Sequence, residues 1–351
     1  MREVRLREMH ASWRVAGHNR LGKPSSYPRS RTVTDKTAEK YRRLHANFLA
    51  HARSRRCDHD LEPLYPTLDK YLDEKYLAGF PQSMLRDTAF AVARHAYLTL
   101  RDLPLSQKAL RGVRKLCPDS SWNPVTWEAV LLIVDELTSS ADSLDVLTGA
   151  AAIIQFDSYA RPSALLNALE TDLFPPARGS PRSTWSLTFW PSTHKQTSKT
   201  GTQDDTVALG RNLSHRDDLH LVASALKKRT PKGAKLFPLC LVAYGGRLRA
   251  AAIRLGLPSA DIVPHMLWHG GASMDALHDV PHDVIQERGQ WAVARSAQRY
   301  SKHGRYLREL HQLTAAQLKR ATALAATLPH RLAARLQSIP YVPLRVTRRT
   351  V

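Results

Sequence analysis

The sequence predicts a mainly α-helical protein with two domains and a small β-hairpin in the second domain. Apolar residues recur at intervals of three and four over most of the chain, which is the period of helices that bury one face. Residues 184–189 and 205–209 instead alternate between apolar and polar types, a pattern typical of two short strands. The 351 residues exceed one typical domain, and turn-forming residues gather near 117–124, where we place the domain boundary.

The N-terminal segment 1–31 is rich in Pro, Ser and Arg and has no sustained period, so we expect a disordered basic arm. Residues 1–60 contain 15 Lys or Arg against 6 Asp or Glu. This charge suits contacts with a polyanion, although an arm that only keeps the protein soluble would explain it equally well. The arm lacks the continuous apolar region of a secretory signal, so we do not expect secretion.

Residues 32–118 predict a helical domain. Helical spacing begins after Thr34 and continues to Arg53, and three further helical segments follow. These segments cover 67–77, 82–100 and 106–116.

Residues 123–312 predict a second domain of the α+β type. Pro124 is typical of a helix start, and the apolar positions after it define one buried face. A buried helix is expected over 144–158. Pro162 then suits the first turn of another helix.

The two alternating runs form the expected hairpin, and the loop between them carries the basic residues Lys195 and Lys199. After the hairpin the pattern is helical again. The last segment, 313–351, predicts a C-terminal helix and a basic tail.

The balance of charge is strongly basic. Lys and Arg number 52 against 31 Asp and Glu, which gives a formal net charge of +21. Such a balance favours a polyanionic partner, and nucleic acid is the commonest one. No apolar run reaches the ~18 residues that a membrane-spanning helix needs. The three isolated cysteines suit neither a disulfide framework nor a Cys-rich zinc site, so we expect a reducing compartment.

Five residues of the second domain could serve a phosphate-directed site. They are Arg161 before a helix, Lys199 in "SKTG", His265 in "HMLWHGGAS", Trp291 in "GQW", and Tyr300 nine positions later. Singly, each residue is typical of an ordinary surface or packing position. Their order and spacing carry more information than any one of them.

In this order the segments resemble the catalytic domain of tyrosine recombinases, the phage integrase family. "YARPSALLNALETDL" is similar to the first box of that family, "SKTG" to its hairpin lysine motif, and "PHMLWHGGAS" to its second box, His-x-x-Arg-His. Trp291 matches the third-box residue, which is His or Trp in the family, and Tyr300 matches the nucleophile. The resemblance implies a helical core-binding domain followed by an α+β DNA breaking-rejoining catalytic domain.

The resemblance also implies a role for each residue. Arg161 would clamp the phosphate, since a planar guanidinium can neutralise charge on two oxygens at once. Tyr300 would attack the phosphodiester while Lys199 protonates the leaving 5′-oxygen and His265 assists proton transfer. Trp291 would pack against the phosphate or donate its indole N–H to it. A 3′-phosphotyrosine would result, so neither a cofactor nor a metal is expected.

Double-stranded DNA is the partner that the resemblance implies, in the recombination or integration of a mobile element. Candidate DNA contacts are Arg42, Arg43, Lys195, Arg299 and Lys302. Recombinases of this kind act as homotetramers on two DNA sites, usually by passing a C-terminal segment to a neighbour. The C-terminal helix is our candidate for that segment, although it can equally pack within its own chain. The protein would act in the nucleus of a eukaryote, or otherwise in the cytoplasm and nucleoid.

The sequence departs from the family pattern at Trp268, which stands where the second box has its other arginine. An indole has one neutral donor and cannot replace a bidentate cation. Nearby Arg254, Arg288 or Arg295 could take over the charge. If none does, the protein is a degenerate recombinase that binds DNA without cutting it. If the site lacks only the arginine at position 268, Trp268→Arg should raise the rate of DNA cleavage.

Two further alternatives concern other residues. Tyr306 is a second candidate nucleophile, since it follows Tyr300 by six residues. A zinc site is a remote alternative, because the sequence has two histidine pairs at helical spacing, His265 with His269 and His278 with His282. The glutamate of a His-Glu-x-x-His site is absent, however, because Met266 occupies its place. We therefore expect these other histidines to serve packing or the surface.

Overall fold

The computed structural model describes most of the chain. The described residues are 33, 35–55, 61–96, 98–117, 122–177, 184–189, 206–210, 218–258 and 261–343. The expected basic arm 1–31, Lys195, Lys199 and the tail 344–351 lie outside them. The chain divides into two compact units, Met1–Ser120 and Ser121–Val351.

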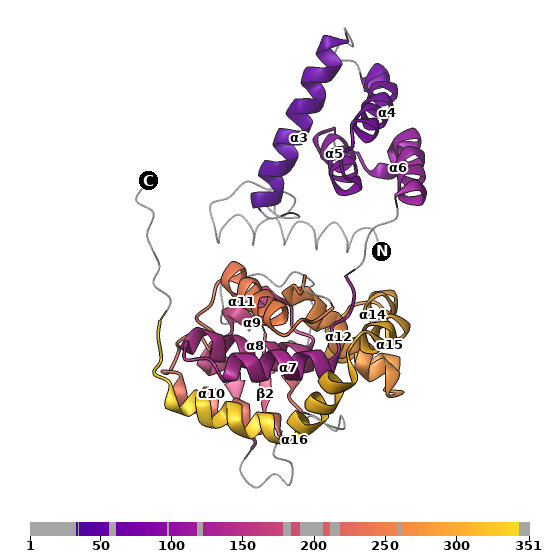
Figure 1. Ribbon diagram of the computed structural model, residues 1–351. Coiled ribbons are helices and arrows are strands. Elements are labelled where there is room, and N and C mark those ends of the chain that lie inside the picture. Colours follow the sequence, from indigo (N-terminus) through magenta and orange to yellow (C-terminus); the bar gives the residue numbers. More distant parts are fainter. Residues whose placement is uncertain are drawn as a thin grey trace, which may run out of the picture. The chain divides into compact units, whose positions relative to one another are not determined.

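The predicted fold class is confirmed: the described residues are mainly helical and contain a three-stranded antiparallel sheet in the second unit (Figure 1). The predicted hairpin corresponds to β2 (Ser186–Thr188) and β3 (Thr206–Ala208), which pair antiparallel. A third strand, β1 (Leu173–Phe174), pairs with β2, with Leu173 opposite Leu187. The sequence analysis did not identify β1, because two residues are too short to show alternation.

The first unit is a helical module with its own core. Its elements are α3 (Asp35–Ser54), α4 (Leu61–Leu77), α5 (Gln82–His95), the 3-10 turn η1 (Leu100–Asp102) and α6 (Pro104–Leu116). Leu44, Phe48 and Ala52 recur every four residues on α3, and all three are buried. Phe48 packs with residues of the other helices, including Leu72 of α4 and Leu85 of α5. Helix α4 begins six residues before the predicted segment 67–77, running through Pro66.

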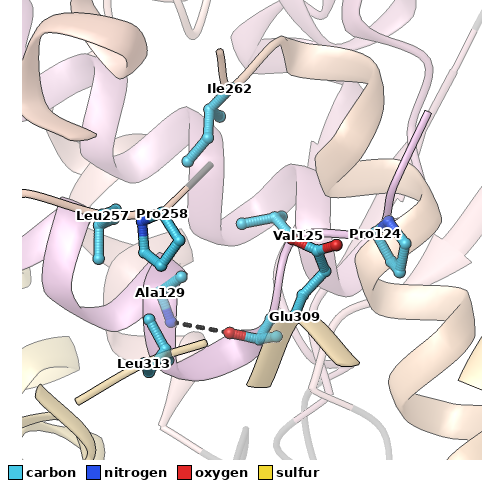
Figure 2. A pocket seen from close by; sticks show the side chains of 9 residues that line it. Pro124, Val125, Ala129, Leu257, Pro258, Ile262, Glu309 and Leu313 are labelled. Atoms are coloured by element: carbon cyan, nitrogen blue, oxygen red, sulfur yellow. Dashed lines mark hydrogen bonds between the residues drawn. The ribbon is translucent and has the colours of Figure 1, made fainter. Parts of the chain in front are cut away.

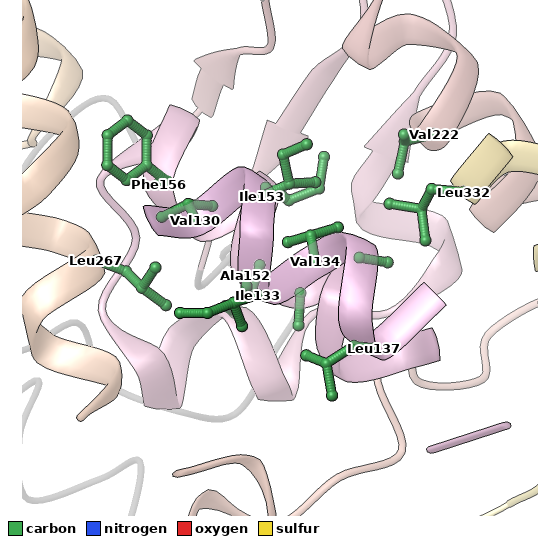
Figure 3. Packing of buried hydrophobic residues seen from close by; sticks show 14 of the residues in the cluster. Val130, Ile133, Val134, Leu137, Ala152, Ile153, Phe156, Val222, Leu267 and Leu332 are labelled. Atoms are coloured by element: carbon green, nitrogen blue, oxygen red, sulfur yellow. The ribbon is translucent and has the colours of Figure 1, made fainter. Parts of the chain in front are cut away.

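The second unit places two buried helices at the centre of its core. They are α7 (Trp127–Thr138) and α8 (Ser143–Ser158). Val130, Ile133 and Val134 of α7 are almost fully buried (Figure 3). The remaining elements surround them: α9 (Pro162–Asn167), η2 (Glu170–Asp172), α10 (Leu219–Arg229), α11 (Leu241–Arg254), α12 (Pro264–Leu277), α13 (His282–Arg288), α14 (Ala294–Tyr300), α15 (His303–His311) and α16 (Ala315–Ser338).

The C-terminal helix α16 packs within its own chain, along α7 and α10 (Figure 1). Its buried face consists of leucines at four-residue spacing, among them Leu328 and Leu332. Two arginines of α16 also hold it to α7: Arg320 and Arg331 each place a nitrogen 2.6 Å from a carboxylate oxygen of the buried Asp135. The sequence left two roles open for this helix, exchange with a neighbouring subunit or packing within its own chain. The structure shows packing within its own chain.

Helix α12 approaches the end of α8 so closely that only glycine fits at the contact. A Cβ atom on Gly271 would lie 2.0 Å from the Phe156 carbonyl oxygen, and one on Gly270 would lie 2.2 Å from the Val125 carbonyl oxygen. Gly271 therefore sets the distance between α12 and the C-terminal turn of α8, and Gly270 sets the distance between α12 and the segment before α7. This contact fixes where the other residues of the motif lie.

We predict that Gly271→Ala lowers the free energy of unfolding by about 1–3 kcal/mol, because the added methyl group collides with backbone that cannot move aside. Denaturant unfolding measures the change. Gly246→Ala is the matched control, since Gly246 lies in α11 and a Cβ atom there would have nothing within 4 Å. The control should be unchanged or up to about 1 kcal/mol more stable, as helix propensity dictates. Equal stability of the two variants would contradict the close approach.

Candidate active site

Arg161 occupies the position predicted for it, directly before a helix. Tyr159 ends α8 in the left-handed conformation, with φ of 50°, and thereby turns the chain toward α9. Arg161 is the N-cap residue of α9, and Pro162 begins the helix. The Arg161 guanidinium carbon lies 5.3 Å from the Trp268 ring centre. Burial lowers the pKa of Arg161, and the nearby Tyr300 hydroxyl acts in the opposite direction, so the two groups share one environment.

A buried glutamine of α8 connects the two predicted phosphate-binding segments. Gln155 Nε2 donates to the carbonyl oxygens of Ala160 and Pro264, at 3.0 and 2.9 Å. These residues directly precede Arg161 and His265. The Tyr244 hydroxyl donates to Gln155 Oε1 at 2.7 Å, which fixes the orientation of the amide. Because every group is buried and satisfied, the backbones leading to Arg161 and His265 are held in one geometry.

Asp157, two residues further along α8, forms a second anchor. It is fully buried and lies 2.8 Å from Nη2 of Arg288. Arg288 also donates to the carbonyl oxygens of Asp157 and Ala208, at 2.8 and 3.0 Å, and the Gly210 amide donates to Asp157. The hairpin and the end of α13 are thus fixed to α8. Arg288 cannot serve as the missing catalytic arginine while it makes these contacts.

The other arginines considered as replacements lie apart from the site contacts. Arg254 Nε donates to Glu136 at 2.7 Å, an ion pair between α11 and α7. Arg295 is exposed at the start of α14. Arg161 places its guanidinium over the Trp268 ring, and neither Arg254 nor Arg295 makes such a cation–π contact with Trp268 or Tyr300 among the described residues.

Tyr300 lies among aromatic rings at the end of α14. Its ring centre is 4.5 Å from that of Trp268, 5.0 Å from that of Trp291 and 4.7 Å from that of His269. The two tryptophan rings are nearly parallel to the tyrosine ring, at 19° and 9°. The Ser273 hydroxyl donates to the Tyr300 carbonyl at 3.1 Å and accepts from the Lys302 amide at 2.8 Å. Tyr300 is therefore held from α12 through both its ring and its backbone.

Trp268 is a buried packing residue, only 5% exposed. It belongs to a small apolar cluster with Tyr159 and Trp291, against which Tyr300 packs. The indole Nε1 atoms of Trp268 and Trp291 are buried, and neither has an acceptor among the described residues. Trp268, which the sequence analysis placed at the position of the second arginine of the family motif, thus packs directly against Tyr300.

The two histidines of the second box have different environments. His265 is exposed on the first turn of α12, whereas His269, one turn later, is buried against Tyr300. Burial, together with the charges of Lys302, His265 and Arg305, lowers the pKa of His269 to about 3. The sequence analysis considered His269 as a partner of His265 in a remote zinc alternative and otherwise expected it to serve packing or the surface. Its four-residue spacing from His265 is the signal that places it on the same side of the helix.

The predicted DNA contacts fall in both units. Arg42 and Arg43 are exposed on α3, and Arg299 is exposed on α14. Lys302 is partly buried and donates to the Trp122 carbonyl at 2.7 Å. Burial, together with the charge of Arg305, lowers the pKa of Lys302 to about 8. Lys302 therefore adds to the positive charge around His269 at neutral pH.

Neither the metal alternative nor a membrane segment finds support in the part of the chain that the structure describes. No three His, Cys, Asp or Glu side chains there come together to hold a metal ion. The His278 Nδ1 atom instead lies 2.8 Å from the Met274 carbonyl oxygen. None of the described helices has both the length and the apolar character to cross a membrane.

A pocket at the start of α7 is separate from these residues (Figure 2). Its volume is about 20 Å³, and its walls include Val125, Leu257 and Ile262, with Glu309 at one side. A mostly apolar lining with a carboxylate does not suit a phosphate. A smaller pocket, of about 10 Å³, lies beside Arg161 and is also lined by Arg288 and Gln290. This second pocket shares Arg161 with the candidate site.

No family model matches the chain, and no curated protein matches it. Solved structures that resemble it include the XerA recombinase, which is 17% identical, with a TM-score of 0.37, over 85% of this chain and 94% of that chain. The XerH site-specific recombinase bound to difH substrate, in a pre-cleavage complex, is 13% identical, with a TM-score of 0.39, over 75% and 77% of the two chains. The XerH site-specific recombinase bound to palindromic difH substrate, in a post-cleavage complex, is 14% identical, with a TM-score of 0.40, over 74% of this chain and 78% of that chain. Values as low as these do not assign a family.

We predict that His269 makes the protein sensitive to acid. Its pKa in the folded state lies below the ordinary value of 6.5, so the unfolded chain takes up the proton first as the pH falls. Stability should therefore decrease below about pH 6.5, by at most about 1.4 kcal/mol per pH unit, until the folded-state pKa near 3 is reached.

Denaturant unfolding of His269→Gln at pH 5 and pH 8 tests this. The variant should lose less stability between these pH values than the wild type. His282→Gln is the control, because His282 is exposed on α13 and should leave the wild-type pH dependence unchanged. A His269→Gln variant with the wild-type pH dependence would contradict a buried neutral histidine.

Proposed function

We propose that this protein is a tyrosine recombinase-like protein that binds duplex DNA and cleaves and rejoins strands through Tyr300. The main support is the convergence of Arg161, Trp268, His269, Trp291 and Tyr300, which come from four separate segments of the sequence. The order of these segments matches the motifs of that family. The net charge of +21 suits a partner whose phosphates supply most of the binding free energy.

In the proposed reaction, the Tyr300 hydroxyl loses its proton, a step in which we assign His265 the assisting role, and its oxygen attacks the phosphorus as the bond to the 5′-oxygen breaks. The phosphate remains as a 3′-phosphotyrosine, and the leaving oxygen takes up a proton, a role we assign to Lys199. Rejoining is the reverse, with a 5′-hydroxyl as the attacking group. Arg161 neutralises charge that builds on the non-bridging oxygens. The bond energy is conserved, so the proposal needs neither nucleotide nor metal.

A second candidate function, DNA binding without cleavage, is favoured by one observation. Trp268 occupies the position of a cation and packs on the ring of Tyr300, 4.5 Å away. An arginine that acts on phosphoryl charge can be worth ~10³–10⁵ in rate. Losing it would reduce cleavage while leaving most phosphate contacts, and hence most affinity, in place.

The setting we infer is recombination or integration of a mobile element. Pairing of two DNA sites would require assembly into a homotetramer. Because α16 packs on its own chain, such an assembly would need contacts other than those that bury the α16 leucines, or release of this helix.

We predict that wild-type protein forms a covalent adduct with a nicked suicide DNA substrate and that Tyr300→Phe abolishes it, because phenylalanine has no attacking oxygen. Denaturing gel electrophoresis of labelled DNA measures the adduct. Tyr306→Phe is the matched control and should retain it. The Tyr306 hydroxyl is buried and accepts from the Trp127 amide at 2.7 Å, so it serves packing. Tight DNA binding with no wild-type adduct would establish the binding-only function instead.

The burial of Trp268 reverses the effect expected from sequence for Trp268→Arg. We predict that this variant loses about 3 kcal/mol or more of stability, because it removes a buried ring and places a cation beside Arg161. It should not cleave faster than the wild type, since Tyr300 loses a stacking partner.

Unfolding curves and adduct yields of Trp268→Arg and Trp268→Phe check this prediction. Trp268→Phe keeps an aromatic ring and should lose much less stability. A stable Trp268→Arg variant with faster cleavage would contradict this prediction and show that the site lacks only an arginine at position 268.

A further inference from the structure

Gln290 has a backbone conformation that favours glycine. It follows the C-cap residue Gly289 of α13, and its φ is 53°. The Gln290 amide donates to the Glu287 carbonyl at 2.9 Å, and the Trp291 amide donates to the Gln286 carbonyl at 3.0 Å. This is the Schellman arrangement at a helix end, in which the left-handed residue is usually glycine. A glutamine there carries a steric cost that the helix end itself does not require.

The side chain of Gln290 has a second unfavourable feature. Its Nε2 atom is buried and has no acceptor among the described residues. A buried donor without an acceptor destabilises a protein, and a ligand oxygen that accepts from it would remove this cost. The neighbouring Gln286 differs, because its Nε2 donates to the Trp291 carbonyl at 3.0 Å.

The surroundings of Gln290 indicate the charge of such a ligand. Gln290 and Arg161 line the same small pocket, together with Arg288, whose charge is already paired with Asp157. The volume of about 10 Å³ has room for about one oxygen-sized atom. Next along the chain, Trp291 presents a further buried N–H without an acceptor among the described residues. The pocket itself is lined by Arg161 and by Gln290, and a cation beside a buried N–H donor suits an anionic oxygen.

We propose that the Gln290 carboxamide is an additional ligand of the DNA phosphate, donating to a non-bridging oxygen of the phosphodiester that Arg161 binds. The inference rests on the proposed function, since it concerns the same phosphate. Gln290 supplies a neutral hydrogen bond at a site where Trp268 has removed a cation. It therefore adds one hydrogen bond to the phosphate and none of the charge that an arginine would bring.

Gln290→Gly separates this role from a structural one, because the two predict opposite signs. Glycine adopts the left-handed conformation without strain and removes the buried donor, so the unfolding temperature should rise by about 2–4 °C. The rate of adduct formation under single-turnover conditions should fall ~10²–10³-fold, the usual effect of losing one preorganised donor. Gln290→Glu, of the same size, should bind duplex DNA more weakly than Gln290→Gly, since a carboxylate repels phosphate.

Gln286→Ala is the matched control, because it removes a carboxamide from the same helix end that already has a protein acceptor. It should lower the unfolding temperature without the rate loss of Gln290→Gly. The inference is overturned if Gln290→Gly lowers stability and rate together, or if it changes neither rate nor DNA affinity. Should wild-type protein form no adduct, a weaker DNA affinity of Gln290→Gly at fixed salt would support the phosphate ligand while refuting strand cleavage.

Discussion

The buried ion pair between Asp157 and Arg288 is the interaction on which the candidate site depends most. Asp157 is fully buried and the Arg288 side chain is 9% exposed, so each charge relies on the other. Removing one partner of such a pair typically costs about 3–5 kcal/mol, since the remaining charge is left uncompensated. Arg288 joins the α8 end to the hairpin through Ala208, and it lies three residues before Trp291. Gln155, two residues before Asp157 on α8, likewise joins α8 to the segments that carry Arg161 and His265.

The C-terminal turn of α8 thus positions the site without contributing a reacting group. The Tyr159 hydroxyl donates to Asp275 of α12, whose pKa burial raises to about 8 in spite of nearby Arg288. The carboxyl of Asp275 is therefore largely protonated at neutral pH and adds no further negative charge next to Asp157. Close approach of α12 through Gly270 and Gly271 makes this contact possible.

The helices and the hairpin could be predicted from sequence because their patterns extend over many residues, as in Leu44, Phe48 and Ala52 of α3. Features set by tertiary packing could not. Trp268 was identified as a departure from the family motif, but its stacking on Tyr300 depends on where α14 ends. Gln290 could not be identified from the sequence. Gly289, one residue earlier, is the residue that a helix end would be expected to place in the left-handed conformation, and a buried donor is visible only in the structure.

Affinity and catalysis depend on different parts of this charge distribution. If DNA is the partner, as proposed, the long-range attraction of a chain with a net charge of +21 comes from many side chains and is little changed by one substitution. Transition-state stabilisation instead needs a few groups fixed at the reacting phosphate. In the proposed site the candidates for this role are Arg161 and the indole N–H groups of Trp268 and Trp291, whose rings pack against Tyr300. Under the proposed function, a tryptophan in place of arginine at position 268 therefore acts on the rate of cleavage and leaves most of the DNA affinity in place.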